Sequence, residues 1–177
     1  KNQKIAVIGS GYWGSIIINI LINLKFKNII VFDTSIKNKF IIKKKYKIIK
    51  FENNFSKILN DKLIKNIFVV TPPIENLPIV KKLIIYNKNI FLEKPGFHNL
   101  KNLIKVQKYL IKSKSKLMFG YIYFYNDYIE KIKKILDKKI LGELQYVSFS
   151  RKNLGPIRSD VDVDYDLTAT KQKVIDM

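Results

Sequence analysis

Short, uninterrupted apolar runs alternate along this chain with longer segments in which apolar residues recur at helical spacing. The runs at residues 4–8, 28–32 and 66–71 are apolar except at their ends. Strands of this kind are buried on both faces, as in a parallel sheet that helices cover on each side. The alternation therefore predicts an α/β fold built on a doubly wound parallel sheet.

Six strands and five helical segments are expected within residues 1–120, which we predict to form one folded domain. The expected strands are residues 4–8, 28–32, 47–51, 66–71, 89–92 and 116–119, and the expected helices are residues 13–24, 35–46, 55–59, 77–86 and 100–112. Asn53 or Asn54 is available to cap the short third helix.

The chain has 177 residues, no cysteine and a net charge of +20. The lack of cysteine excludes disulfides and thiolate metal ligands, and it favours a reducing compartment. All basic residues except Arg151 and Arg158 are lysines spread along the whole chain, so we interpret the charge as a coding bias and expect no nucleic-acid partner. The alternatives are a polyanion-binding patch at residues 37–50 and base stacking on the aromatic residues of 121–128.

The most apolar stretch, residues 16–24, is interrupted by Asn19 and Asn23. It falls far short of the roughly 20 apolar residues that a membrane span needs. The N-terminal apolar run leads into glycines, whereas a signal peptide leads into a small-residue cleavage site. We therefore expect no membrane partner and a cytoplasmic location.

Gly9, Gly11 and Gly14 form the pattern G-x-G-x-x-G directly behind the first expected strand. In such a turn the first glycine allows a tight bend, the second lets a pyrophosphate approach the backbone, and the third lets helix and strand pack closely. The N-terminus of the following helix offers N–H groups and a partial positive charge to phosphates. The pattern and its position predict a Rossmann dinucleotide-binding fold.

Asp33 follows the second expected strand and lies nineteen residues after Gly14. An acidic residue at this place can accept hydrogen bonds from the ribose hydroxyls of the adenosine. Its charge disfavours a 2′-phosphate, so we predict NAD as the cofactor. Lys37 and Lys39 lie close enough in sequence to serve a 2′-phosphate, so NADP stays the alternative.

Two more loops follow strands at the edge of the sheet where ligands bind in folds of this kind. Thr71-Pro72-Pro73 ends the fourth expected strand, and Glu93-Lys94-Pro95 follows the fifth. Taken alone, the first is a rigid turn and the second is a surface turn with an ion pair. Together, in this order behind the glycine pattern, they indicate a cofactor and substrate site.

These motifs resemble the Gfo/Idh/MocA family of NAD(P)-dependent oxidoreductases. The resemblance implies hydride transfer between a nicotinamide and a hydroxyl-bearing carbon of a sugar or nucleotide sugar, a small-molecule substrate. The stretch RKNLGPIRSD most resembles members that act on nucleotide-linked sugars in surface polysaccharide synthesis. The matching stretches, spread over residues 4–169, are AVIGSGYWG, VFD, VVTPP, FLEKPGFHN, FGYIYFYNDYIEKIKKIL, LGELQYVSFSRKNLGPIRSD and YDLTA.

The resemblance also implies roles for particular residues. Lys94 would act as a proton relay or orienting cation beside the nicotinamide, and Asp166 would lie in the same catalytic pocket. The implied cofactor-binding residues are Gly9, Ser10, Gly11, Tyr12, Trp13, Gly14, Asp33, Thr34, Thr71, Pro72, Pro73, Glu93, Lys94 and Pro95. The implied substrate-binding residues are Lys94, Asn126, Arg151, Arg158 and Asp166, and no metal is expected.

By the same resemblance, residues 121–177 would be the incomplete start of a C-terminal α+β domain, with its first strand at residues 142–151. In relatives this domain forms the sugar site and usually the oligomer interface. A homo-oligomer is therefore expected of full-length relatives, but the expectation does not carry over to this chain.

The chain departs from the family pattern at three histidine positions. Thr170 stands four residues after Asp166, where the family has its catalytic histidine. Asn76 and Tyr121 also stand where relatives have histidines, and the only histidine, His98, is interpreted as a loop or capping residue. We therefore expect a truncated oxidoreductase. The alternative is a catalytically inactive remnant that still binds the dinucleotide.

Overall fold

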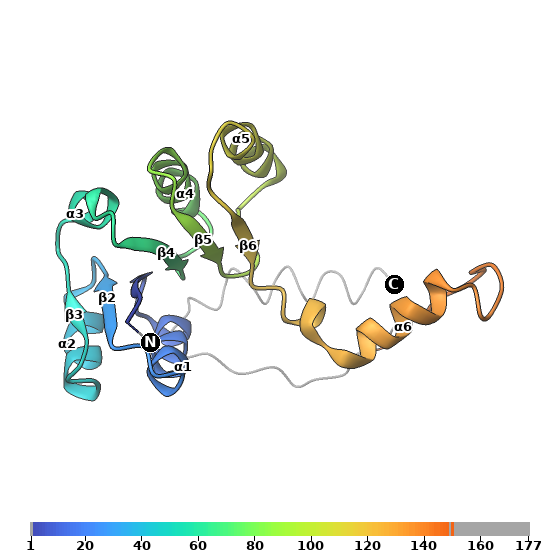
Figure 1. Cartoon of the computed structure of the whole chain (residues 1–177), viewed down its shortest axis with the longest axis horizontal. Helices are drawn as coiled ribbons and strands as arrows, with labels where there is room; N and C mark the ends of the chain where they lie inside the picture. Colours follow the sequence, from blue (N-terminus) through green and yellow to red (C-terminus); the bar gives the residue numbers. More distant parts are fainter. Residues whose placement is uncertain (1, 149, 151–177) are drawn as a thin grey trace, which may run out of the picture. The chain divides into compact units, whose positions relative to one another are not determined.

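The computed structural model describes residues 2–148 and 150, and internal contacts divide the chain into two units, residues 1–131 and 132–177. Within the described residues, six strands pair in parallel in the order β3-β2-β1-β4-β5-β6 (Figure 1). The predicted α/β class and parallel sheet are confirmed. The strands are β1 (Lys4–Ile8), β2 (Asn28–Phe32), β3 (Lys50–Phe51), β4 (Ile64–Val69), β5 (Asn89–Leu92) and β6 (Leu117–Phe119).

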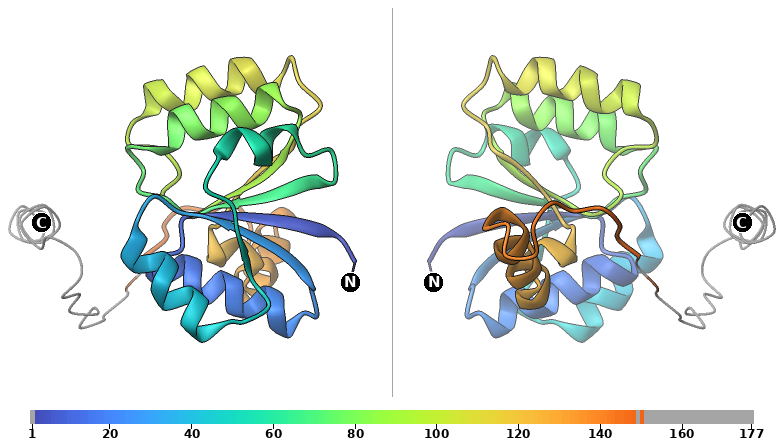
Figure 2. Two further views of the ribbon diagram at one scale, coloured as in Figure 1. Left: turned by 90° about the vertical axis from the view of Figure 1, so that its left-hand side faces the viewer. Right: turned by 90° about the vertical axis from the view of Figure 1, so that its right-hand side faces the viewer.

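Helices cover both faces of this sheet (Figure 2). The side chains of β1 alternate between two cores: Ile5 and Val7 pack under α1 and α2, whereas Ala6 and Ile8 pack under α3, α4 and α5. Burial on both faces explains why the strands are apolar without interruption. The helices are α1 (Tyr12–Asn23), α2 (Ile36–Lys45), α3 (Phe55–Asn60), α4 (Asn76–Ile85) and α5 (Leu100–Leu110).

Three strands differ from their predicted bounds, and for β6 the difference is only that it begins at Leu117 and not at residue 116. Only Lys50–Phe51 of the expected strand 47–51 pairs with β2, because the chain before it forms a turn in which the Ile49 N–H donates to the Tyr46 carbonyl. The fourth strand is shifted to Ile64–Val69, so Thr71 lies in the loop that follows. The short helix α3 is capped as expected, by Asn54, whose side chain accepts from the Ser56 N–H at 2.9 Å.

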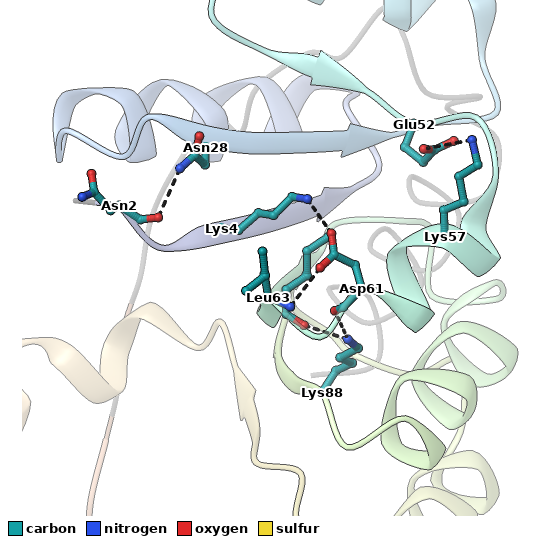
Figure 3. A network of polar contacts seen from close by, with 9 residues as sticks. Asn2, Lys4, Asn28, Glu52, Lys57, Asp61, Leu63 and Lys88 are labelled. Carbon is teal, nitrogen blue, oxygen red and sulfur yellow. Dashed lines mark hydrogen bonds and ion pairs between the residues drawn. The ribbon is translucent and has the colours of Figure 1, made fainter.

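Three charged residues, Lys4, Asp61 and Lys88, form a network at the amino ends of β1 and β4, hereafter the amino-end network (Figure 3). Lys4 pairs with the carboxylate of Asp61. Lys88 is buried, and its Nζ donates to the carbonyl oxygens of Asp61 at 2.7 Å and Ile64 at 2.8 Å. Burial lowers the pKa of Lys88, and the nearby Asp61 charge offsets part of this effect. The network holds the loop before β4 against the loop before β5.

After β6 the chain forms the 3₁₀ turn η1 (Ile122–Tyr125) and the helix α6 (Asp127–Asp137). The strand predicted at residues 142–151 is wrong over the residues that the structure describes, since 142–148 are not in a strand. A strand is defined by its ladder with a neighbour, and none of the described strands pairs with this segment. The predicted domain boundary at residue 120 stays a prediction.

Among the described helices, none combines the length and the apolar character that crossing a membrane requires.

Candidate functional site

Two glycines shape the turn after β1, because a side chain fits at neither position. Gly9 has a φ of +89°, and a Cβ there would lie 2.6 Å from the carbonyl oxygen of Val70, just past β4. A Cβ on Gly14 would lie 2.2 Å from the carbonyl oxygen of Gly9, so the first turn of α1 packs directly on the loop. This is the tight bend and the close helix packing that the glycine pattern predicts.

Gly11, in contrast, is surrounded by space. The nearest atom to a Cβ on Gly11 would be the side-chain nitrogen of Asn38, 4.0 Å away. Gly11 is also the N-cap of α1 and provides no side-chain acceptor for the N–H groups of the first turn. Tyr12 and Trp13, which begin this turn, are exposed and meet edge to face. The backbone at this point is therefore open to a ligand.

The carboxylate of Asp33 joins the end of β2 to the glycine turn. Its Oδ2 accepts from the backbone N–H and from the hydroxyl of Ser10, both at 2.6 Å, and from the Asn38 side chain at 3.2 Å. Its Oδ1 accepts from the N–H of Ser35 at 2.7 Å. Each oxygen of an ionised carboxylate has about two lone-pair sites. Oδ2 is fully used by its three donors, whereas Oδ1 accepts one hydrogen bond and keeps one site for a ligand hydroxyl.

Asp33 is 7% exposed, yet its pKa lies below the ordinary value of 3.8. Burial alone raises the pKa of this carboxyl, because it disfavours the charged form. The hydrogen bonds from Ser10, Ser35 and Asn38 stabilise the charged form and outweigh burial. The carboxylate is therefore ionised at neutral pH. Thr34, which follows it, is exposed.

Asn76 connects the loop after β4 to the loop after β5. It is the first residue of α4 and is 1% exposed. Its Oδ1 accepts from the hydroxyl of Thr71 at 2.6 Å, and its Nδ2 donates to the carbonyl oxygen of Gly96. Within the loop after β4, the Glu75 N–H donates to the Pro72 carbonyl at 2.9 Å and closes a turn before α4. Through its two side-chain bonds, Asn76 joins the loop after β4 to the loop after β5.

The segment Glu93-Lys94-Pro95 forms a tight turn directly after β5. The Lys94–Pro95 peptide bond is cis, and the N–H of Gly96 donates to the carbonyl oxygen of Glu93 at 3.0 Å. The hydroxyl of Tyr121 donates to the carbonyl oxygen of Pro95 at 3.1 Å. Burial raises the pKa of Glu93, and the backbone N–H and charge of Lys94 offset part of the rise. The Lys94 side chain itself is exposed.

Taken together, these contacts run without a break along the carboxyl ends of β2, β1, β4 and β5, which are neighbours in the sheet (Figure 1). The edge includes the point where the strand order reverses, between β1 and β4, where ligands bind in doubly wound sheets. In order, the string of contacts is Asp33 to Ser10, Gly9 to Val70 and Thr71, Thr71 to Asn76, and Asn76 to Gly96. The predicted motifs after all four strands thus meet at one edge.

Sequence reasoning missed three residues that build this edge. Asn38 was not expected to bind Asp33, although its place three residues after the α2 cap, Ser35, is a signal that could have found it. Asn76 and Tyr121 were noted only as departures from a family pattern. Their contacts depend on a loop geometry that spacing along the chain does not reveal.

The remaining predicted residues lie elsewhere. Asn126 caps α6, where its side-chain oxygen accepts from the N–H groups of Tyr128 at 2.9 Å and Ile129 at 3.3 Å. His98 is exposed, next to the α5 cap Asn99. Within the described part of the chain, no three histidine or acidic side chains gather as a metal site. Arg151, Arg158, Asp166 and Thr170 lie outside the described residues.

A family model described as "Oxidoreductase family, NAD-binding Rossmann fold", the Gfo/Idh/MocA model, matches residues 3–121. The chain belongs to this family. The predicted Gfo/Idh/MocA relationship and Rossmann fold are thereby confirmed, and NAD is confirmed as the cofactor at the level of the family. The match includes every described residue of the string from Asp33 to Gly96. No curated protein matches the chain.

Several solved structures show the same fold. Myo-inositol 2-dehydrogenase from Lactobacillus plantarum is 21% identical, with a TM-score of 0.69 over 80% of this chain and 43% of its own. Scyllo-inositol dehydrogenase from Lactobacillus casei, with bound NAD(H) and scyllo-inositol, is 20% identical, with a TM-score of 0.67 over 80% of this chain and 43% of its own. An NAD-binding protein from Listeria innocua is 18% identical, with a TM-score of 0.66 over 81% of this chain and 42% of its own. The chain therefore spans less than half the length of these proteins.

Proposed function

We propose that this chain provides the dinucleotide-binding half of an NAD-dependent dehydrogenase that oxidises a hydroxyl of a sugar or nucleotide sugar. The observation that carries the proposal is the unbroken string of contacts at the carboxyl edge of the sheet. It joins an ionised acid, an open glycine turn and the Lys94 loop on four neighbouring strands. A dinucleotide is a ligand long enough to use all three.

The residues at this edge fit NAD. The space around Gly11 and the first-turn N–H groups of α1 suit a pyrophosphate, which needs close backbone approach and a positive helix end. Asp33 suits the adenosine ribose, because Oδ1 can accept a further hydrogen bond while Oδ2 stays on Ser10. When bound, NAD supplies the carbon that accepts the hydride.

The preference for NAD over NADP follows from the charge of Asp33. The carboxylate is held ionised by neutral donors, so it would repel a 2′-phosphate at the same place. Lys39, one of the two lysines that could serve such a phosphate, donates to the side chain of Asn53 at 2.9 Å. We therefore infer that the chain discriminates against NADP.

Lys94 is the chain's candidate for handling the proton. Its exposed ammonium stands in a fixed turn at the end of β5, where it can donate a hydrogen bond to the substrate hydroxyl. Such a bond favours loss of the hydroxyl proton as the hydride leaves the same carbon. As an ammonium, Lys94 Nζ would orient the hydroxyl. It would relay the hydroxyl proton only after it has given one of its own protons to solvent or to a second acid–base group.

The substrate class is proposed from the sequence. The stretch RKNLGPIRSD supports a nucleotide-linked sugar, with Arg151 and Arg158 suited to its phosphates and Asp166 to its hydroxyls. Asn126 is a weaker candidate for substrate contact, since its oxygen already caps α6. A second function, dinucleotide binding without catalysis, is favoured by Thr170 at the position of the family histidine.

A titration of the chain with NADH, followed by fluorescence, tests the cofactor proposal. Saturable binding is expected, and Asp33→Ala should raise the Kd at least tenfold, because hydrogen bonds to charged groups contribute about 1.5–3 kcal/mol. Asp137→Ala, which removes an exposed acid of α6, is the matched control and should leave the Kd unchanged. A folded chain that does not bind NADH would overturn the proposal.

The two functions separate in a second step. The chain is incubated with NAD and a panel of nucleotide sugars, and formation of NADH is followed. Turnover that Lys94→Met abolishes while NADH binding persists supports the dehydrogenase. Binding of NADH with no turnover on any substrate supports the second function.

A further inference from the structure

We propose that Asn76 and Tyr121 are positioning residues for Lys94, which they fix by holding the two backbone carbonyls that follow it. The proposal rests on the function proposed above, in which Lys94 acts beside the nicotinamide. The proposal adds that two side-chain hydrogen bonds keep the turn that carries Lys94 in one conformation. The turn held in this way, residues 93–97, is called the lysine turn below.

The lysine turn offers few groups by which it can be held. Pro95 has no N–H, and the N–H of Gly96 is already used inside the turn, on the carbonyl of Glu93. The N–H of Glu93 joins the turn to β4 by donating to the Val69 carbonyl at 2.9 Å, and the N–H of Lys94 bonds to the Glu93 carboxylate. The carbonyl oxygens of Pro95 and Gly96 are the attachment points after Lys94. Each of them accepts a hydrogen bond from a side chain of a different segment.

Asn76 holds the Gly96 carbonyl from the β4 side. Its side chain is buried, so its amide must find both a donor and an acceptor inside the protein. The Gly96 carbonyl can only accept, which requires Nδ2 to face it and leaves Oδ1 for the Thr71 hydroxyl. The side-chain amide of Asn76 meets both requirements, since it carries an acceptor and a donor. Asn76 thereby transmits the position of the cofactor-side loop to the lysine turn.

Tyr121 holds the Pro95 carbonyl from the β6 side. Its ring packs on Phe119, 5.8 Å between centroids, and on Phe124, 6.1 Å between centroids. Phe119 also fixes Gly96 directly, since a Cβ on Gly96 would lie 2.5 Å from its ring. The ring that carries the Tyr121 hydroxyl is thus held by a tilted and an edge-to-face aromatic contact. The lysine turn is held between the segments that follow β4 and β6, the two strands that flank β5.

The test compares ligands with and without the nicotinamide, using the full chain. Asn76→Asp keeps an acceptor for Thr71 but loses the donor to Gly96, and Tyr121→Phe loses only a hydroxyl. Each should raise the Kd for NADH about two- to tenfold, the range for one hydrogen bond. Neither should change the Kd for ADP-ribose, which lacks the nicotinamide and is measured by competition. Asn60→Asp and Tyr125→Phe, exposed residues of the same kinds, are the controls.

The outcomes separate this proposal from the function on which it rests. Asp33→Ala should weaken the binding of both NADH and ADP-ribose. Positioning by Asn76 and Tyr121 is overturned if their two variants leave the Kd of both ligands unchanged, or raise both Kd values equally. If the wild-type chain binds neither ligand, the cofactor proposal fails, and hydrogen exchange decides the present one. The amides of Glu93, Lys94, Gly96 and Phe97 should then exchange at least twofold faster in both variants, with those of β1 unchanged. Equal exchange in variants and wild type overturns the holding of the turn.

Discussion

The two ends of the sheet hold their charged side chains in opposite ways. At the amino end, Lys4 pairs with Asp61, and the buried Lys88 donates to backbone carbonyls near the same aspartate (Figure 3). At the carboxyl end, the donors to Asp33 within the described residues are two backbone N–H groups, a hydroxyl and an amide, all neutral. At the amino end, the carboxylate is thus paired with a cation, and the second lysine is satisfied by carbonyl oxygens. At the carboxyl end, Asp33 is bonded by neutral groups alone among the described residues, and its Oδ1 keeps a site that can accept from a neutral hydroxyl.

The largest expected effect is at the carboxyl end. Gly14→Ala places a Cβ 2.2 Å from the carbonyl oxygen of Gly9, and backbone cannot move aside as a side chain can. We expect a loss of about 3 kcal/mol of unfolding free energy, the upper range for overpacking, together with loss of NADH binding. Urea denaturation measures the first effect and the NADH titration measures the second.

Gly11→Ala is the matched control, because the nearest atom to the new Cβ is 4.0 Å away. Its unfolding free energy should stay within about 0.5 kcal/mol of the wild-type value. NADH affinity should still fall, since the methyl group occupies the approach to the pyrophosphate. Retained affinity in Gly11→Ala would show that the phosphates bind elsewhere.

The second prediction sharpens the comparison from the amino end. Lys88→Met keeps the buried length of the side chain but leaves the carbonyls of Asp61 and Ile64 without their donor. Buried groups left unsatisfied cost about 1–3 kcal/mol, so the unfolding free energy should fall by that amount. NADH affinity should not change, because the amino-end network and the candidate site lie at opposite ends of the strands. A change in NADH affinity in a stably folded Lys88→Met would contradict this separation.

Much of the fold could be predicted from the sequence, since apolar runs and helical spacing record burial directly. Strands 4–8, 28–32 and 89–92 were predicted with their observed bounds. The segment at residues 142–148 was wrongly predicted to be a strand, because a strand needs a partner and no local pattern records whether one is present.

The candidate site likewise has a part that could be predicted from local sequence and a part that could not. The glycines and Asp33 have fixed spacing within one strand–turn–helix unit, so the sequence could predict them. The contacts of Asn76 with Gly96 and of Tyr121 with Pro95 join residues 20 and 26 positions apart, across different strands. Such contacts depend on how loops close in three dimensions. Only the structure could show them.

The smallest expected effect is a difference between the two ends in how the unfolding free energy depends on pH and on salt. The pKa values of Asp33 and Asp61 both lie below their ordinary value, 3.8, Asp33 through neutral donors that outweigh burial and Asp61 mainly through its bond to Lys4. Each carboxylate therefore stabilises the fold above pH 3.8, and this stabilisation is lost as the pH falls through the lowered pKa. The loss should show as a smaller unfolding free energy at about pH 3 than at about pH 6.

Salt should distinguish the two contributions. A partly exposed ion pair contributes at most about 1 kcal/mol, and about 1 M salt screens it. Lys4→Met should therefore remove the part of the acid-induced loss that salt also removes. Asp33→Asn should remove a part that persists in high salt, since its donors carry no charge. Urea unfolding of both variants at the two pH values, in low and high salt, measures this difference. A salt-sensitive contribution from Asp33 would mean that cations near the carboxyl end stabilise it, and the contrast between the two ends would then be one of degree.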